Sequence, residues 1–460
     1  MAGHYHLIGI GGIGMSGIAQ LLLKRGVTVT GSDVKENRIT QDLRRKGARI
    51  FIGHDAKNAC GADAVVYSSA IAQDNPEMVQ ANLQGSRLLK RAQALAELMQ
   101  GKTVVTIAGS HGKTTTTSLV SYLLLEAGLA PTAAIGGVFR NIDTNAYFGD
   151  GDFFVAEADE SDASFLCYHP KYSIVTNIDR EHLDHYGDFR REVETFREFI
   201  NLTDTAGCVF YCNDDPSLRK IMKDYRYGCV SFGLTEEAQI YASGIQLQGF
   251  HSQFDCVYKG KAVGHFEIAL AGMHNVSNSL AVIALGLELG IAFETIQRTL
   301  IGYKGAGRRF EVKFCAHKCL VIDDYAHHPT EIRATLAAAK NLQYGRLIAV
   351  FQPHRYTRTR LLLDEFGRSF DAADYVIVTD IYAASEAPIE GVNAAGVCDA
   401  IRAAAPGKKV CYMPKADIVE HVLGMLRTGD LVIILGAGDI VKTAEEIAVK
   451  MEQQCSGAHT

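Results

Sequence analysis

One segment combines the residue types and spacing that bind phosphate. Gly109–Thr117 reads GSHGKTTTT and stands between a β-branched run, Thr103–Ala108, and an apolar helical stretch. In such a loop the backbone N–H groups surround phosphate oxygens, Lys113 can reach the β- and γ-phosphates, and the Thr114 hydroxyl can bind Mg²⁺. The spacing is G-x-x-G-K-T, because Ile107 occupies the first glycine position of the longer motif. This segment predicts binding of a nucleoside triphosphate with a divalent cation.

Carboxylates and imidazoles follow the next two predicted strands. Four acids come directly after the strand Phe153–Ala156: Glu157, Asp159, Glu160 and Asp162. Mg²⁺ in proteins takes one or two carboxylates together with phosphate and water, so at least one of these acids is expected to serve the cation. The strand Ser173–Asn177 leads into IDREHLDH, and the pattern alone does not choose between His182 and His185 as a functional imidazole.

A glycine turn near the N-terminus predicts a diphosphate site. Gly9, Gly11 and Gly14 fit G-x-G-x-x-G between a predicted strand, His6–Ile10, and a predicted helix, Met15–Lys24. Glycines let the backbone approach a pyrophosphate, and the helix N-terminus supplies N–H donors. Asp33, at the end of the next strand, could accept a hydrogen bond from a ribose hydroxyl. Taken alone the turn is typical of NAD-dependent dehydrogenases, but it does not identify the nucleotide.

Further polar groups stand at the starts of helices and the ends of strands. His274, Asn275 and Asn278 precede an apolar helix, where simple N-capping by Asn275 or Ser277 is the alternative to a ligand contact. Arg308 and Arg309 could swing onto a phosphate or form a solvated hinge pair. Two strand ends, Asp323–Pro329 and Phe351–Arg358, carry histidines and arginines that suit a small anionic substrate. Gly436–Asp439 forms a further glycine turn.

These groups need strand-and-helix units to position them. Short β-branched runs alternate with amphipathic helices along the chain, which predicts an α/β protein built on parallel sheets. We divide it into three domains, 1–100, 101–305 and 306–460. The outer two are expected to be Rossmann-like, and the central one to be a P-loop domain with a mainly parallel sheet. A β-rich excursion is expected between about residues 240 and 270.

Composition limits the classes of function. The 460 residues carry a net charge of −6, which argues against a general nucleic-acid binder. No apolar run approaches the ~18 residues that a membrane span needs. The first cationic residue is Lys24, which argues against a signal peptide, and the 11 cysteines show no CxxC pair. We expect reduced thiols, a cytoplasmic location and no membrane span.

Taken together, the motifs resemble those of the Mur ligases, in particular the alanine-adding branch, over essentially the whole chain. The segments that carry the resemblance are Gly9–Gly17 (GIGGIGMSG), Gly109–Thr117, Glu157–Leu166 (EADESDASFL), Thr176–Asp184 (TNIDREHLD), His274–Asn278 (HNVSN), Arg308–Glu311 (RRFE), Asp323–Glu331 (DDYAHHPTE) and Phe351–Thr359 (FQPHRYTRT). The resemblance implies an ATP-dependent amide ligase of peptidoglycan precursor synthesis with UDP-N-acetylmuramate, L-alanine and ATP as substrates. It replaces the NAD interpretation of the glycine turn.

The resemblance also implies roles for individual residues. Lys113, His182 and His327 would be catalytic, and Thr114, Glu157 and His182 would hold two Mg²⁺ ions, which Mn²⁺ could replace. ATP would be bound by Gly109, Ser110, His111, Gly112, Lys113, Thr114, Thr115, His274, Asn275, Asn278 and Arg308. The UDP-sugar would be bound by Gly11, Gly12, Ile13, Gly14, Ser32, Asp33, Ser68, Ser69, His111 and Asn177. L-Alanine would be bound by Tyr325, His327, Arg355 and Arg358.

One departure from sibling ligases bears on the metal site. Several siblings carry a carbamylated lysine that helps to bind the second metal, whereas no lysine occurs here between Lys171 and Lys220. This agrees with the alanine-adding branch and favours His182 as a metal ligand.

Three alternatives stay open from the sequence. The related ligase that adds a recycled tripeptide to the same nucleotide sugar is the nearest, and Gly12 with Tyr325 favours the alanine enzyme. A dehydrogenase would leave Gly109–Thr117 unexplained. An ATP-dependent switch without ligase chemistry would hydrolyse ATP without the other substrates. We expect a monomer or a weak homodimer.

Overall fold

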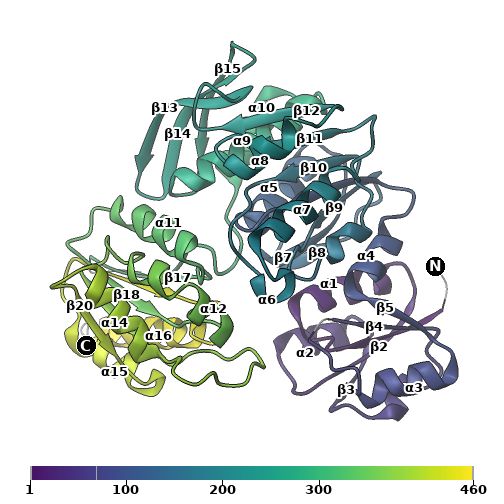
Figure 1. Cartoon of the computed structure of the whole chain (residues 1–460), viewed down its shortest axis with the longest axis horizontal. Helices are drawn as coiled ribbons and strands as arrows, with labels where there is room; N and C mark the ends of the chain where they lie inside the picture. Colours follow the sequence, from purple (N-terminus) through teal and green to yellow (C-terminus); the bar gives the residue numbers. More distant parts are fainter. Residues whose placement is uncertain (1–2, 69, 317, 458–460) are drawn as a thin grey trace. The chain divides into compact units, whose positions relative to one another are not determined.

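The computed structural model describes residues 3–68, 70–316 and 318–457. The chain forms two compact units, which Figure 1 draws in colours that follow the sequence. The first unit consists of Met1–Ser243, Asp255–Phe266 and Ser277–Lys304. The second consists of Gly244–Phe254, Glu267–Val276 and Gly305–Thr460.

The N-terminal part of the first unit is a parallel five-stranded sheet in the order β3-β2-β1-β4-β5. Its strands are β1 (His4–Ile8), β2 (Thr28–Asp33), β3 (Arg49–Ile52), β4 (Ala64–Tyr67) and β5 (Arg87–Lys90). Its helices are α1 (Ile13–Lys24), α2 (Arg38–Arg45), η1 (Ala56–Ala59), α3 (Pro76–Gln84) and α4 (Arg91–Met99). The strand order reverses between β1 and β4, and ligands of open α/β sheets bind at such a point.

The first strand ends earlier than its hydrophobic run predicts. The prediction of a strand over His6–Ile10 is wrong at its C-terminal end, because β1 stops at Ile8. Gly9 takes a φ of +75°, which only glycine adopts without strain, and its N–H donates to the Ser32 carbonyl at 2.8 Å. The Ile10 N–H donates to the same carbonyl at 3.0 Å. The chain therefore turns across the end of β2 and directs α1 back along the sheet.

The central sheet has ten strands in the order β15-β14-β13-β12-β11-β10-β6-β9-β7-β8. The strands are β6 (Thr103–Ala108), β7 (Thr132–Phe139), β8 (Thr144–Tyr147), β9 (Phe153–Glu157), β10 (Tyr172–Val175), β11 (Cys208–Cys212), β12 (Cys229–Gly233), β13 (Ile240–Gln248), β14 (His251–Tyr258) and β15 (Lys261–Ile268). The pairs from β7 through β9, β6, β10 and β11 to β13 are parallel, and β8 is antiparallel to β7. Strands β13–β15 confirm the predicted β-rich excursion.

The helices of this part are α5 (Lys113–Glu126), η2 (Ser164–Cys167), α6 (Leu183–Tyr186), α7 (Phe189–Ile200), α8 (Pro216–Met222), α9 (Met273–Glu288) and α10 (Phe293–Gly302). Buried aromatic packing fixes one of them: Phe165 of η2 stacks on Phe199 of α7 with ring centroids 4.6 Å apart. Helix α1 packs against the β7–β8 hairpin, where the Asn145 side-chain amide donates to the Ile13 carbonyl (Figure 1).

The second unit contains a six-stranded sheet in the order β16-β17-β21-β18-β19-β20. Its strands are β16 (Glu311–Ala316), β17 (Cys319–Asp324), β18 (Arg346–Phe351), β19 (Tyr375–Val378), β20 (Lys409–Tyr412) and β21 (Asp430–Leu435). Its helices are α11 (Pro329–Lys340), α12 (Tyr356–Leu361), α13 (Leu363–Gly367), α14 (Ala394–Ala404), η3 (Lys415–Asp417), α15 (Ile418–Met425) and α16 (Val441–Gly457). All its pairs are parallel except β16 with β17. Both faces of the sheet are buried in apolar cores, which explains the continuous apolar strands.

The α/β class predicted from the sequence is therefore confirmed. Among the described residues, no helix is both long enough and apolar enough to cross a membrane.

Candidate active site

The phosphate loop connects β6 to α5, as its motif predicts. At two positions of the loop only glycine fits, because the backbone has a positive φ and because a Cβ would collide with a neighbouring side chain. Gly112 has a φ of +84°, and a Cβ there would lie 2.7 Å from the Asn278 side-chain oxygen. Gly109 has a φ of +127°, and its Cβ would lie 2.2 Å from the Thr176 hydroxyl oxygen. The loop is thus packed between α9 and the segment after β10.

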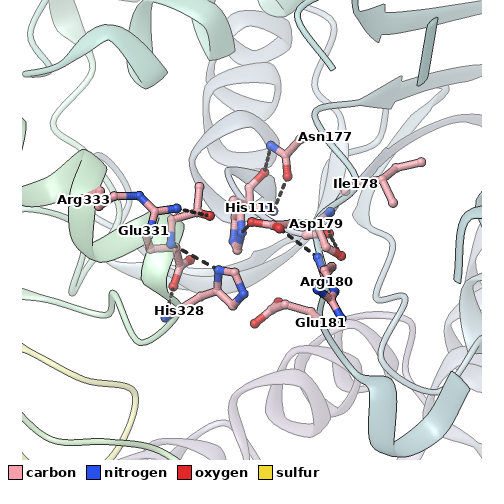
Figure 2. Close-up of polar contacts among 12 residues, drawn as sticks. His111, Asn177, Ile178, Asp179, Arg180, Glu181, His328, Glu331 and Arg333 are labelled. Carbon is pink, nitrogen blue, oxygen red and sulfur yellow. Dashed lines mark hydrogen bonds and ion pairs between the residues drawn. The ribbon is translucent and has the colours of Figure 1, made fainter. Parts of the chain in front are cut away.

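Hydrogen bonds to that segment hold the loop in place. Figure 2 shows the His111 ring directed at Asp179, with 2.9 Å between Nε2 and Oδ2, and Asn177 beside the His111 backbone. The Asn177 side chain accepts from the His111 N–H at 2.8 Å and donates to its carbonyl at 3.1 Å. The Asp179 N–H donates to the Ser110 hydroxyl at 2.8 Å. The predicted residues Ser110, His111 and Asn177 therefore lie together.

Lys113 is bound on several sides. Its ammonium donates to the carbonyls of Gly109 at 2.6 Å and Ser110 at 3.0 Å and to Glu160 Oε1 at 2.9 Å. Burial alone would lower the pKa of Lys113, but the carboxylates of Glu160, Glu157 and Asp159 outweigh burial and raise it. Lys113 thus carries a fixed positive charge at the position where a phosphate loop receives the γ-phosphate.

Thr114 and Glu157 form the first candidate cation site. The Thr114 hydroxyl donates to Glu157 Oε2 at 2.9 Å, and the backbone N–H of Gly136 on β7 donates to the same oxygen at 3.0 Å. A Cβ at Gly136 would lie 2.4 Å from that oxygen, so β7 approaches the carboxylate closely. A hydroxyl and a carboxylate beside a phosphate loop are ligands that suit Mg²⁺.

Glu160, Glu181 and His182 form a second group. Their ligand atoms lie within 4.8 Å of one another, and His182 Nε2 is 3.7 Å from Glu160 Oε1 and from Glu181 Oε2. Glu160 is fully buried, and within the described part of the chain its Oε2 has no hydrogen-bond partner. Oxygen and imidazole donors together fit Mg²⁺ or Mn²⁺. His185, by contrast, is exposed and lies against Tyr186, so the structure brings His182 to the carboxylates.

A further buried acid, Glu192, lies on α7 behind this group. Its side chain is fully buried, and among the described residues no side chain bonds either carboxylate oxygen. Burial, followed by the charges of Glu160 and Glu181, raises the pKa of Glu192 to about 9. Glu192 therefore holds its proton at neutral pH in the folded protein, whereas the unfolded chain releases it.

This difference predicts a pH-dependent gain in stability for Glu192→Gln. Between the ordinary pKa of a glutamate and about 9, unfolding releases the Glu192 proton, so the free energy of unfolding falls as pH rises, by up to about 1.4 kcal/mol per unit. Glu192→Gln has no proton to release on unfolding at this position, so its free energy of unfolding does not fall with pH for this reason. In EDTA, we expect it to gain at least about 1 kcal/mol over the wild type between pH 5.5 and pH 8 in denaturant unfolding. Glu198→Gln, an exposed acid of the same helix, should not change with pH; an equal effect of Glu192→Gln at both pH values would contradict the prediction.

A cavity of about 220 Å³ opens at the N-terminal glycine turn. It is lined by Gly9, Gly12, Ile13, Gly14, Met15, Tyr67, Ser68, Lys90, Arg91, Ala92, Asp159, Asp162 and Ser164. The predicted residues Gly12, Ile13, Gly14 and Ser68 therefore share one cavity at the strand-order reversal. Ser69, also predicted, lies outside the described residues.

Arg91 is a charged residue of this cavity that the sequence did not predict. It begins α4 directly after β5, and its Nη2 lies 2.6 Å from Asp159 Oδ2. A Cβ at Gly14 would lie 2.5 Å from Arg91 Nη1, so the guanidinium lies against the start of α1. Neighbouring Lys90 adds a second cation to the cavity wall. No motif surrounds Arg91, and only the fold brings it to the glycine turn.

Other predicted residues support the turn rather than line the cavity. The Gly11 N–H donates to Asp33 Oδ2 at 2.9 Å. Ser32 is fully buried, its hydroxyl donates to Glu77 Oε2 at 2.5 Å, and its carbonyl receives the turn N–H groups described above. Three hydrogen bonds, led by that from His6, outweigh burial and lower the pKa of Glu77 to about 2. The buried, charged Glu77 thus holds Ser32 in place, and the Ser32 carbonyl in turn binds the glycine turn.

In the second unit, the predicted amino-acid residues gather at the carboxyl ends of β17 and β18. The ring centroids of Tyr325 and His327 are 5.3 Å apart, and those of His327 and His354 are 5.5 Å apart. Arg358 Nη1 lies 3.0 Å from His354 Nδ1. Arg355 takes a φ of +69° and its guanidinium lies 3.9 Å from Glu386. His354 is a member of this group that the sequence analysis did not assign.

Arg308 and Arg309 are both engaged within this unit. The Arg308 guanidinium donates to the carbonyls of Gly436 at 2.5 Å and Gly438 at 3.1 Å and lies 3.2 Å from Asp323. Both guanidinium groups lie over the Tyr325 ring, at 5.2 Å for Arg308 and 5.0 Å for Arg309. Because both guanidinium groups lie against other groups of this unit, the structure does not support the interpretation of Arg308 and Arg309 as a solvated hinge pair.

The HNVSN segment forms the first turn of α9. The N-cap interpretation of Asn275 and Ser277 is wrong, because the helix begins at Met273 and both residues lie inside it. The Asn275 side chain donates to the Ala271 carbonyl at 2.8 Å. Burial, and then the charge of Arg309, lower the pKa of His274 to about 4, so this imidazole stays neutral.

The fold and the site define a P-loop nucleotide-binding protein with a carboxylate-rich candidate cation site and a cavity at the glycine turn. Comparison with known proteins then gives the family. The models of the Mur ligase family catalytic domain, the Mur ligase middle domain and the Mur ligase glutamate ligase domain match residues 4–103, 107–286 and 308–438. The chain belongs to the Mur ligase family.

Similar proteins cover nearly the whole chain. A UDP-N-acetylmuramate–L-alanine ligase of Geobacter sp. strain M21 is 45% identical over 448 residues, which are 97% of this chain and 97% of that protein. One of Geotalea uraniireducens is 46% identical over 97% of this chain and 98% of its own length.

Two solved structures are also similar. The UDP-N-acetylmuramate-alanine ligase of Thermotoga maritima has a TM-score of 0.84 at 28% identity and covers 98% of this chain and 100% of its own. A murein peptide ligase of Psychrobacter arcticus has a TM-score of 0.73 at 24% identity, covering 97% and 98%, and supports the fold alone.

Proposed function

We propose that this protein joins L-alanine to the lactyl carboxylate of UDP-N-acetylmuramate, with ATP as the third substrate and an acyl phosphate as the intermediate. The observation that carries the proposal is one acidic segment that serves two sites. Glu157 and Glu160 bind the residues of the phosphate loop, while Asp159, Asp162 and Ser164 line the cavity of the glycine turn. A sugar carboxylate and a γ-phosphate can therefore meet along this segment. The names of the similar proteins supply the identity of both substrates.

The nucleotide sugar is expected to bind in the N-terminal cavity. The backbone of Gly11–Gly14 and the N-terminus of α1 offer N–H groups to its diphosphate, and Arg91 and Lys90 offer positive charge. Asp33 and Ser32 would support the turn, and Ser68 lines the cavity beside it. His111 of the phosphate loop and Asn177 after β10 would contact the sugar. A UDP diphosphate thus takes the place that a dinucleotide has in dehydrogenases.

ATP is expected to bind at Gly109–Thr115, with Lys113 on the γ-phosphate and His274, Asn275, Asn278 and Arg308 on the nucleoside side. Thr114 and Glu157 would hold one Mg²⁺, and His182 with Glu160 a second one, which Mn²⁺ can replace. Bound Mg²⁺ neutralises charge that develops between the phosphate and the carboxylate. The chain itself supplies the Lys113 ammonium, which Glu160 holds in position.

A carboxylate cannot expel oxide when an amine attacks it, so one of its oxygens must first become a better leaving group. Transfer of the γ-phosphoryl group to a carboxylate oxygen releases ADP and gives an acyl phosphate. The alanine nitrogen then attacks the acyl carbon, the carbon–oxygen bond to phosphate breaks, and the nitrogen proton passes to His327. Tyr325, Arg355 and Arg358 would hold the alanine carboxylate. Phosphate release that requires both the sugar and the amino acid would distinguish this ligase from a simple ATPase.

Domain limits, location and assembly complete the proposal. The domains 1–100, 101–305 and 306–460 would bind the sugar, ATP and the amino acid, respectively. The use of ATP and a nucleotide sugar favours the cytoplasm as the place of action, with the protein a monomer or a weak homodimer.

Phosphate release tests the proposed function. With ATP, Mg²⁺ and UDP-N-acetylmuramate present, L-alanine should raise phosphate release by at least tenfold and give an amide product of matching mass. Release driven only by the tripeptide would assign the protein to the recycling ligase instead. Equal release without the sugar or the amino acid would favour an ATP-dependent switch, and binding of NAD(H) without phosphate release would favour a dehydrogenase.

A further inference from the structure

Glu331 stands at a position that couples a helix start to the proposed amino-acid site. It occupies the third position of α11, and its side chain is 11% exposed. Oε2 accepts from the backbone N–H of His327 at 3.1 Å and of His328 at 3.3 Å, and His328 is the N-cap of the helix (Figure 2). The same oxygen lies 3.2 Å from Nδ1 of the His327 ring. The carboxylate therefore touches the ring as well as capping the helix.

These contacts determine which nitrogen of His327 carries the proton. Nδ1 lies 3.0 Å from the Tyr325 carbonyl and 3.2 Å from the Glu331 carboxylate. Both oxygens can only accept, so Nδ1 must be the N–H nitrogen. The lone pair of the neutral ring is then on Nε2. A histidine in this tautomer can take a proton through Nε2 while Nδ1–H stays bonded to the carboxylate.

The ring is also held in orientation by its neighbours. Tyr325 meets it edge-on at an interplanar angle of 83°, and His354 meets it at 68°. Charged and titratable groups face this region from several elements. They are Glu331 on α11, Arg309 before β16 and 3.4 Å from Glu331, Arg308 beside it over the Tyr325 ring, Arg358 on α12, which bonds His354, and Asp324 and His274, which both interact with Glu331. The arginines disfavour a further positive charge here, and Glu331 is the carboxylate that lies 3.2 Å from the ring.

We propose that Glu331 is a positioning residue for catalysis: it fixes the Nδ1–H tautomer of His327 and stabilises the imidazolium that forms when His327 accepts the alanine nitrogen proton. The inference rests on the proposed function. In the step concerned, the C–N bond forms, the bond between the acyl carbon and the phosphate oxygen breaks, and the nitrogen proton moves to Nε2. Phosphate leaves with the electron pair of the broken bond. Glu331 itself touches neither substrate.

The substitution Glu331→Gln separates this role from helix capping. A glutamine side-chain oxygen still accepts from the backbone N–H groups at the helix start, so α11 keeps its cap, but the negative charge beside Nδ1 is lost. We expect kcat with L-alanine to fall about 10- to 100-fold while KM for L-alanine stays within about threefold. The acid limb of the kcat/KM profile should move to lower pH by about half a unit or more, because the imidazolium is less stable.

Glu331→Asp, which keeps the charge, should recover part of kcat. Glu420→Gln changes an exposed acid at the start of α15 and is the matched control. A variant Glu331→Gln with wild-type kcat and pH profile would overturn the inference. So would a parallel loss of kcat and thermal stability with an unmoved acid limb, since that result indicates a cap alone. Failure of the wild type to release phosphate with L-alanine would instead overturn the proposed function.

Discussion

Lys113→Ala is expected to lower turnover at least 1,000-fold while leaving the affinity for UDP-N-acetylmuramate within about threefold of the wild type. Lys113 is the cation that the phosphate loop offers to the γ-phosphate, and the alanine variant removes that charge from the place where negative charge accumulates. Its loss also leaves the buried Glu160 without the cation that pairs with it, so this acid would face the phosphate unopposed. Charge stabilisation of this kind accounts for about 3–4 kcal/mol or more of a barrier.

Two measurements test this prediction. Steady-state phosphate release gives the loss of turnover, and calorimetric titration of the variant with the nucleotide sugar gives the affinity. Lys220→Ala, a change of an exposed lysine on α8, serves as the control and should keep full activity. A Lys113→Ala enzyme with a near-normal rate would contradict the proposal that this loop binds the γ-phosphate of ATP.

Arg91→Ala is expected to raise KM for the nucleotide sugar about 100-fold with KM for ATP and L-alanine changed by no more than about threefold. The guanidinium lies against the glycine turn and pairs with Asp159 at 2.6 Å, so it can contribute bidentate contacts to a diphosphate. Arg91, followed by Lys113, outweighs burial and lowers the pKa of Asp159. The alanine variant therefore places an unpaired carboxylate beside the expected diphosphate, and repulsion adds to the lost contacts.

A matched set of variants gives this prediction its specificity. Arg190→Ala removes an exposed arginine of α7 and should leave every KM unchanged. Arg91→Lys keeps the charge but loses the planar fork, so its KM should fall between those of the wild type and the alanine variant. If Arg91→Ala weakened ATP binding as much as sugar binding, the cavity would not be the sugar site.

The elements nearest the phosphate loop were predictable because their chemistry is local. Strand Thr103–Ala108 has the predicted bounds, and Gly112 and Lys113 begin the helix that the motif requires. The alternation of strand-like and helix-like apolar patterns along the chain also predicts parallel strands that are connected by helices. Acids after β9 were identified as a group, whereas only the fold shows that Glu157 meets Thr114 and Glu160 meets Lys113.

The site features that the sequence did not predict depend on contacts between residues that are far apart along the chain. Strand β5 is only four residues long with charged ends, so no pattern marks it, and Arg91 follows from its position. Glu192 looks like a surface residue in its charged segment, yet α7 turns it toward the core. The residue pattern alone left His182 and His185 open, and the family resemblance favoured His182. In the structure His182 has a φ of +52° and its Nε2 lies 3.7 Å from Glu160.

The acidic segment after β9 would couple the two nucleotide sites of the proposed function. Asp159 interacts with both Arg91 at the cavity and Lys113 in the phosphate loop, so a ligand that draws either cation away changes the field felt by the other. By thermodynamic reciprocity, any factor by which one ligand alters the affinity for the second must also operate in reverse. Sequence drift in these few residues therefore alters both affinities together, and a homologue with a new sugar donor would have to readjust its phosphate chemistry as well.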